Sequence, residues 1–156
     1  DEITSKVYNY IIDEAQKGNI ALMTGAKEML EFLSSRGKKM VMGTSADSFM
    51  ANTLLESKGI KDYFSHIITA DDVERGKPDP EVFLRGAGKM NINPSKTMVF
   101  EDSINGVKAA YGAGMLPVMI PDKLTPTEDI EDMLYKKFDD FLKVIEYFKT
   151  QETKTK

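Results

Sequence analysis

The sequence contains no cysteine and only one histidine, so several classes of site are missing from it. Without cysteine there can be no disulfide framework and no thiolate metal site. No apolar run approaches the roughly 20 residues that a membrane-spanning helix needs, so we expect no membrane segment. Lysine and arginine are scattered in a chain of net charge -4, which argues against a nucleic-acid or anionic membrane surface.

The rest of the composition is typical of a globular protein. The 156 residues are 41% hydrophobic and 29% charged, enough for one domain with a core, and we expect a cytoplasmic monomer. The ten methionines suit the filling of gaps in that core. His66 lies in an apolar run, where a packed or edge histidine is expected rather than a catalyst.

Short apolar runs alternate with helical patterns along the chain. Strands are expected at 40–42, 64–69, 97–100 and 115–120, and helices at about 2–17, 26–36, 47–58, 104–112 and 138–148, with a further helix starting at Asp79-Pro80. Parallel strands need crossover connections, and these cover both faces of a sheet. The pattern therefore predicts an α/β fold with a doubly wound parallel sheet.

The two ends of the chain carry separate predictions. Ile3, Val7, Tyr10 and Ile11 recur at helical spacing, so the first helix is expected to bury this stripe against a partner surface. At the other end, residues 151–156 are polar, and we expect a disordered tail.

Three loops that follow strands hold the residues that could bind a ligand or take part in a reaction. They carry Thr44-Ser45, Lys77 and Glu101-Asp102. Ligands bind outside the carboxyl ends of strands in open α/β sheets, so these loops should converge. Hydroxyls, backbone N–H groups and an ammonium can hold a phosphate group, and a carboxylate pair can hold Mg²⁺.

Simpler interpretations exist for each of these groups. Glu101 and Asp102 could be ordinary loop acids, and Thr44-Ser45 could cap the next helix. Lys77 could be a solvated loop lysine. Asp71 and Asp72 could join the site, although a solvated turn is the more common role for such acids.

Three segments resemble motifs two, three and four of the haloacid dehalogenase (HAD) superfamily, above all its branch of sugar-phosphate phosphatases and β-phosphoglucomutases. They are residues 41–46 (Val-Met-Gly-Thr-Ser-Ala), 76–83 (Gly-Lys-Pro-Asp-Pro-Glu-Val-Phe) and 99–110 (Val-Phe-Glu-Asp-Ser-Ile-Asn-Gly-Val-Lys-Ala-Ala). The resemblance runs from about residue 20 to residue 122, with the motifs in the family's order.

The resemblance implies a Mg²⁺-dependent phosphatase that acts on a small phosphorylated metabolite through an aspartyl-phosphate. Thr44 would bind the transferring phosphoryl oxygens with the Ser45 backbone, and Lys77 would neutralise charge on the nucleophile and phosphoryl group. Asp102 would hold Mg²⁺ together with Glu101. A β-phosphoglucomutase-type phosphomutase shares these motifs and is the alternative.

The sequence departs from the family in one respect. No apolar run in residues 1–40 ends in Asp-x-Asp, so the family's nucleophile and general acid have no counterpart. Residues 1–20 resemble the end of the family's helical cap, and 21–150 its Rossmann-like core without the first strand. That strand would lie between those ending at Thr44 and at Glu101, which should therefore not pair with each other.

We therefore expect a fragment of a larger enzyme that is inactive alone and needs an N-terminal segment of the same protein. The hypothesis from another class is a non-catalytic, truncated phosphate- or partner-binding protein that keeps the pocket without the nucleophile.

Overall fold

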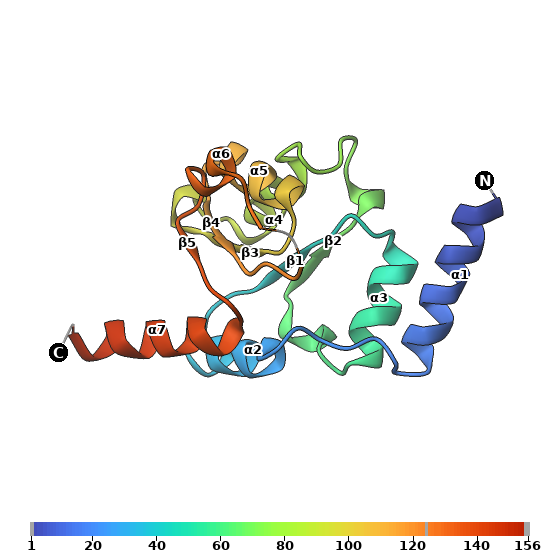
Figure 1. The fold of residues 1–156 in the computed structure, drawn as a ribbon, viewed down its shortest axis with the longest axis horizontal. Helices are drawn as coiled ribbons and strands as arrows, with labels where there is room; N and C mark the ends of the chain where they lie inside the picture. Colours follow the sequence, from blue (N-terminus) through green and yellow to red (C-terminus); the bar gives the residue numbers. More distant parts are fainter. Residues whose placement is uncertain (1, 124, 155–156) are drawn as a thin grey trace.

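The structure is a computed structural model that describes residues 2–123 and 125–154. It has parallel strands alternating with helices (Figure 1). The strands are β1 (Val41–Gly43), β2 (His66–Ile68), β3 (Met98–Glu101), β4 (Leu116–Met119) and β5 (Lys136–Lys137). The α-helices are α1 (Glu2–Gln16), α2 (Ala26–Ser35), α3 (Ser48–Ser57), α4 (Glu81–Met90), α5 (Ile104–Gly112), α6 (Glu128–Glu131) and α7 (Phe141–Lys154).

The strands form the middle layer of the fold. Figure 1 shows α4, α5 and α6 on one side of them and α2 and α7 on the other, while α1 lies beside α3. Helix α4 packs on β1 and β2, and α5 packs on β3 and β4. The prediction of an α/β fold with a doubly wound parallel arrangement is confirmed.

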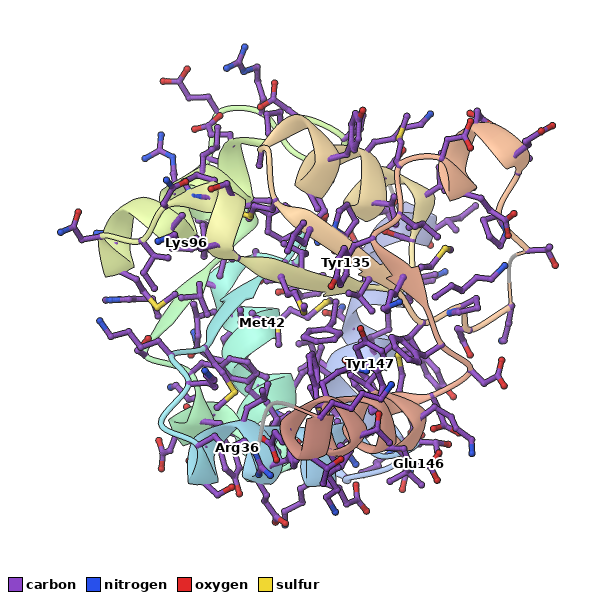
Figure 2. The ribbon with its side chains drawn as sticks, turned by 90° about the vertical axis from the view of Figure 1, so that its left-hand side faces the viewer. Arg36, Met42, Lys96, Tyr135, Glu146 and Tyr147 are labelled. Carbon is purple, nitrogen blue, oxygen red and sulfur yellow. The ribbon has the colours of Figure 1, made fainter. Side chains whose placement is uncertain are left out.

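Each side of the strand layer has its own core. Between α4, α5 and β3 the buried residues include Ala87, Val99 and Ala110. Under α2 and α7 the buried residues are Met29, Phe32, Ile120 and Val144. Figure 2 shows Tyr147 on the side of α7 that faces the strands, where Lys136 Nζ of β5 lies 4.8 Å from the centre of its ring.

The strands are divided between two sheets. Strand β1 pairs with β2, and the second sheet has the order β3-β4-β5. All pairs are parallel. Among the described residues, β1 and β3 do not pair with each other, as expected for a fold that lacks a strand between them.

The two unpaired edges face the gap between the sheets. Thr44 N–H donates to Ile68 O, and Met40 O accepts from Ser65 N–H. The even-numbered residues along β1 and at its two ends therefore form the hydrogen bonds with β2 and its flanking residue. The backbone groups of Val41 and Gly43 therefore point the other way. By the same alternation, Met98 and Phe100 of β3 point away from β4, because Glu101 O accepts from Ile120 N–H.

Helix α1 has the predicted bounds, but the prediction for its buried face is wrong. The stripe expected to be buried is largely exposed: Ile3 is 75%, Val7 53% and Tyr10 65% accessible. The helix packs on α3 through a neighbouring stripe that contains Tyr8 and the fully buried Ala15. The Tyr8 hydroxyl donates to Asp47 Oδ1 at 3.1 Å, which fixes this choice of face.

Other element boundaries also differ from the predictions. Helix α7 runs from Phe141 to Lys154 rather than 138–148, so residues 151–154 are helical and not a disordered tail, while 155–156 lie outside the described residues. Pro80, not Asp79, is the residue before α4, although Asp79 Oδ1 still accepts from Glu81 N–H at 3.0 Å. Helix α6 and strand β5 were not predicted.

No helix within residues 2–123 and 125–154 combines the length and apolar character needed to cross a lipid bilayer. The cytoplasmic location stays a prediction.

Two glycines with the same left-handed backbone provide a matched test of the contact between the loop before α2 and the start of α7. Gly18 has φ +76° and Gly25 has φ +77°. An added Cβ at Gly25 would lie 2.8 Å from the backbone nitrogen of Leu142, whereas an added Cβ at Gly18 would meet no described residue within 4 Å apart from its chain neighbours. Phe141 N–H also donates to Thr24 O at 3.1 Å, so this contact ties the loop to α7.

We expect Gly18→Ala to cost about 1 kcal/mol of unfolding free energy, the usual penalty for a side chain in the left-handed region. Gly25→Ala should cost about 1 to 3 kcal/mol more, because the start of α7 must move. Urea unfolding of both variants measures the difference, and equal costs would contradict the contact between this loop and α7.

Candidate functional site

All five predicted site residues line one cavity. It has a volume of about 560 Å³ and lies at the carboxyl ends of β1 and β3. Thr44 and Ser45 follow β1, Glu101 ends β3 and Asp102 follows it, and Lys77 comes from the loop before α4. The convergence expected from the sequence is therefore present, while the chemical roles of these residues stay predictions.

Lys77 is the residue that joins the two sheets. Its ammonium donates to Gly43 O at the end of β1, at 3.1 Å, and forms an ion pair with Glu101 Oε1 at the end of β3. The side chains of Lys77 and Glu101 are only 11% and 8% exposed. The ring centre of Phe83 in α4 lies 4.8 Å from the ammonium. The alternative of a solvated loop lysine is wrong.

Glu101 is held in place by the turn that follows it. The Ser103 hydroxyl donates to Glu101 Oε2 at 3.0 Å and also accepts from Gly106 N–H at 3.0 Å, which caps α5. A Cβ on Gly106 would lie 2.0 Å from the Glu101 carboxylate. Glycine is therefore required at position 106 if Glu101 is to occupy this position.

Asp102 differs from Glu101 in its surroundings. Its side chain is exposed and lines the cavity. The carboxylate makes no hydrogen bond or ion pair with any other residue that the structure describes. It is thus available to a ligand, whereas the Glu101 carboxylate already has two partners in Lys77 and Ser103.

These two carboxylates fit part of a magnesium site. Mg²⁺ is usually held by one or two protein carboxylates, with water and phosphate oxygens completing six ligands. Over 2–123 and 125–154 no cluster of three or more histidine, aspartate or glutamate side chains gathers around one point. Asp102 and Glu101 can therefore supply hard oxygen ligands, and the remaining ligands must come from water, a substrate or another segment.

Thr44 and Ser45 do not cap the helix that follows them, so that alternative is wrong. Asp47 caps α3 by accepting from Met50 N–H at 2.8 Å, and Asp71 accepts from Ser48 N–H at 2.8 Å. Among the described residues, the Thr44 hydroxyl oxygen accepts only from Ala46 N–H, at 3.1 Å. Both hydroxyl groups therefore remain available at the cavity.

The second acidic pair is structural. Asp71 braces α3, and Asp72 accepts from the N–H group of Thr69 at 2.7 Å and from its hydroxyl at 2.9 Å. The N–H donor first, and then the hydroxyl, lower the pKa of Asp72. Neither residue lines the candidate site, and neither does His66, which lies in β2.

Several lining residues received no role from sequence reasoning. Ser103 and Asn105 lie in the motif after β3, and their places at the cavity depend on how that turn folds. The remaining wall is apolar and consists of Met23, Met42, Phe100, Ile120 and Phe141.

Comparison with known proteins places this cavity in a family. A model of haloacid dehalogenase-like hydrolases matches residues 2–114. The chain is 38% identical over 120 residues to YhcW of Bacillus subtilis, covering 77% of this chain and 51% of that protein. It is 40% identical over 91 residues to a phosphorylated carbohydrates phosphatase of Thermotoga maritima, covering 58% of this chain and 42% of the relative.

Solved structures agree with the sequence comparison. A β-phosphoglucomutase from Clostridium difficile superimposes with a TM-score of 0.76 at 26% identity, covering 99% of this chain and 66% of that one. This chain spans about half the length of the curated relatives that it matches. The resemblance carried by the three motifs is confirmed, and the chain belongs to the haloacid dehalogenase-like hydrolases.

Proposed function

We propose that this chain is the carboxyl-terminal part of a Mg²⁺-dependent phosphatase that acts on a small phosphorylated metabolite, such as a sugar phosphate. The observation that carries the proposal is the gathering of Thr44, Ser45, Lys77, Glu101 and Asp102 around one cavity. The name of the Thermotoga maritima relative supports phosphorylated carbohydrates as the substrate class. The reaction would pass through an aspartyl-phosphate whose aspartate is not in this chain.

Each side chain has a role that its surroundings support. The hydroxyl of Thr44 and the backbone N–H of Ser45 would donate to the oxygens of the transferred phosphoryl group. Lys77 would lie against the same group, because its ammonium is held at the carboxyl ends of both β1 and β3. Phosphoryl transfer depends mostly on such positioning and charge neutralisation.

Asp102, together with Glu101, would hold the magnesium ion. When bound, the ion would neutralise negative charge on the phosphate oxygens. Asp102 is the stronger candidate because its carboxylate has no other partner in the described chain. Glu101 would keep Lys77 in place and contribute a ligand, directly or through water.

The gap between β1 and β3 supports the further proposal of a missing strand. Among the described residues, neither edge of the gap pairs with another strand, and apolar residues such as Met42 and Phe100 lie along the cavity. A strand entering it would satisfy both edges and bury those side chains. We propose that an N-terminal segment of the same protein fills the gap and brings the nucleophile to Lys77.

Two alternatives follow from specific observations. A phosphomutase is supported by the likeness to the Clostridium difficile β-phosphoglucomutase, which extends over nearly the whole of this chain. A non-catalytic binding protein is supported by the presence of the pocket in a sequence without an Asp-x-Asp motif. Both share the phosphate-binding residues and differ in the reaction.

The proposal is tested by combining the chain with the N-terminal segment of its parent protein and assaying p-nitrophenyl phosphate and a panel of sugar phosphates. We expect Mg²⁺-dependent release of phosphate from the combination and none from the chain alone, because only the combination contains the nucleophile. The control is the same segment with its Asp-x-Asp aspartates changed to asparagine. A combination that binds phosphate but does not hydrolyse the esters would instead favour the binding protein.

A second prediction concerns the metal. In the active combination, Asp102→Ala should lower Mg²⁺-dependent turnover by about a hundredfold or more, since it removes the free carboxylate of the site. The matched control is Asp62→Ala, an exposed aspartate outside the cavity. A Mg²⁺ titration of turnover measures the effect, and full activity in Asp102→Ala would contradict the metal assignment.

A third prediction uses two glycines of α5. Gly106→Ala would place its Cβ 2.0 Å from the Glu101 carboxylate, so Glu101 and Lys77 must move and turnover should fall about tenfold or more. At Gly112 a Cβ meets only Pro80, at 3.8 Å, and Gly112→Ala should retain activity. Equal activity of the two variants would show that the position of Glu101 has no part in the reaction.

A further inference from the structure

The carboxylate of Glu81, in the first turn of α4, accepts hydrogen bonds from the backbone of the loop that carries Lys77. Glu74 N–H donates to its two oxygens at 3.1 and 3.2 Å, and Arg75 N–H donates to Oε2 at 3.0 Å. On its other side, Arg85 Nε donates to Oε1 at 2.8 Å. The Glu81 side chain is only 15% exposed.

The other end of the same loop is tied to the same helical turn. Asp79 Oδ1 accepts from Glu81 N–H at 3.0 Å, and Asp79 N–H donates to Gly76 O at 3.1 Å. Arg75 Nε lies 3.2 Å from Asp79 Oδ2, which joins the two ends of the loop to each other. Lys77 therefore lies between two attachment points, residues 74–75 and Asp79.

Glu81 offers acceptors only, which suits it to this task. The hydrogen bond from Arg85, followed by those from the N–H groups of Glu74 and Arg75, lowers the pKa of Glu81. The carboxylate is therefore ionised at neutral pH, and hydrogen bonds to charged acceptors are stronger than those between neutral groups.

A lysine side chain has four rotatable bonds, so the position of its ammonium depends on where its backbone is held. Lys77 reaches Gly43 O and Glu101 from a loop with no regular structure between residues 73 and 80. No other side chain in the described chain accepts hydrogen bonds from two backbone N–H groups of this loop.

We propose that Glu81 is a positioning residue for Lys77. By holding the N–H groups of Glu74 and Arg75 against α4, it fixes the backbone from which Lys77 reaches the ends of β1 and β3. The inference rests on the proposed function, because a phosphoryl-binding role for Lys77 gives its position a catalytic consequence. Glu81 itself does not line the cavity and touches no reacting group.

The test measures the accessibility of Lys77 in the 156-residue chain without assaying turnover. Wild type, Glu81→Gln, Arg85→Ala and Glu152→Gln are labelled briefly with acetic anhydride, and the acetylation rate of each lysine is read by peptide mass spectrometry. Glutamine has the shape of glutamate but turns one acceptor oxygen into a donor that faces a backbone N–H. Glu152→Gln is the matched control, because Glu152 also pairs with an arginine, Arg36, and neither residue lines the cavity.

We expect Glu81→Gln to raise the acetylation rate of Lys77 about tenfold relative to the other lysines, the change that corresponds to the loss of one hydrogen bond to a charged group. Arg85→Ala should have a smaller effect, because both backbone hydrogen bonds remain. Glu152→Gln should leave Lys77 unchanged. Amide exchange should also become faster at Glu74 and Arg75.

An unchanged Lys77 rate in folded Glu81→Gln would overturn the inference. An equal rise at all lysines would also overturn it, because it would show a general loss of stability. If Glu81→Gln fails to fold by circular dichroism, Glu81→Asp decides: it keeps the charge but is too short to reach both N–H groups, and it must show the same selective rise. A chain that passes this test but shows no phosphatase activity when it is combined with the N-terminal segment of its parent protein would contradict the proposed function alone.

Discussion

The ion pair between Lys77 and Glu101 spans the gap between the two sheets of this protein. Both side chains are nearly buried, so each loses most of its hydration. Such a pair is stable only when further hydrogen bonds satisfy its members. Gly43 O accepts a hydrogen bond from the ammonium, and the Ser103 hydroxyl donates one to the carboxylate. Removing one member of a buried pair typically costs about 3 to 5 kcal/mol, so the residues around it depend on each other.

The sequence around this pair is constrained by it. Ser103 has to accept from the backbone of α5 and donate to Glu101 at the same time, which a small hydroxyl residue can do. Gly106 has to lack a side chain because the carboxylate occupies that space. Gly43 O is free for Lys77 because its edge of β1 has no partner strand in the described chain.

Much of this could be predicted from the sequence because strand ends and helix starts are local signals. The runs before Thr44 and Glu101 end abruptly in polar residues, and this placed Thr44, Ser45, Glu101 and Asp102 at the carboxyl ends of their strands. Which helix faces pack against each other was not predictable in the same way. Helix α1 has two adjacent apolar stripes, and periodicity shows that both exist but not which one meets α3.

Other differences arose where local composition gave the wrong signal. Residues 151–154 are polar, which favoured a disordered tail, but glutamine, glutamate and lysine are also good helix formers and continue α7. Strand β5 consists of two lysines and has no apolar pattern, so it is recognised as a strand from its pairing with β4. The roles of Ser103 and Gly106 depend on a contact with Glu101 that is formed only in the folded chain.

The charge of the cavity supports a divalent cation in the proposed reaction. Among the described residues that line it, one ammonium faces two carboxylates, so the lining carries a net negative charge. A phosphate monoester is itself an anion, and the ammonium of Lys77 is already neutralised by Glu101. Coulomb repulsion from Asp102 would disfavour binding of the ester beside it. A magnesium ion on Asp102 would reverse the sign of the site, which makes metal and substrate binding interdependent.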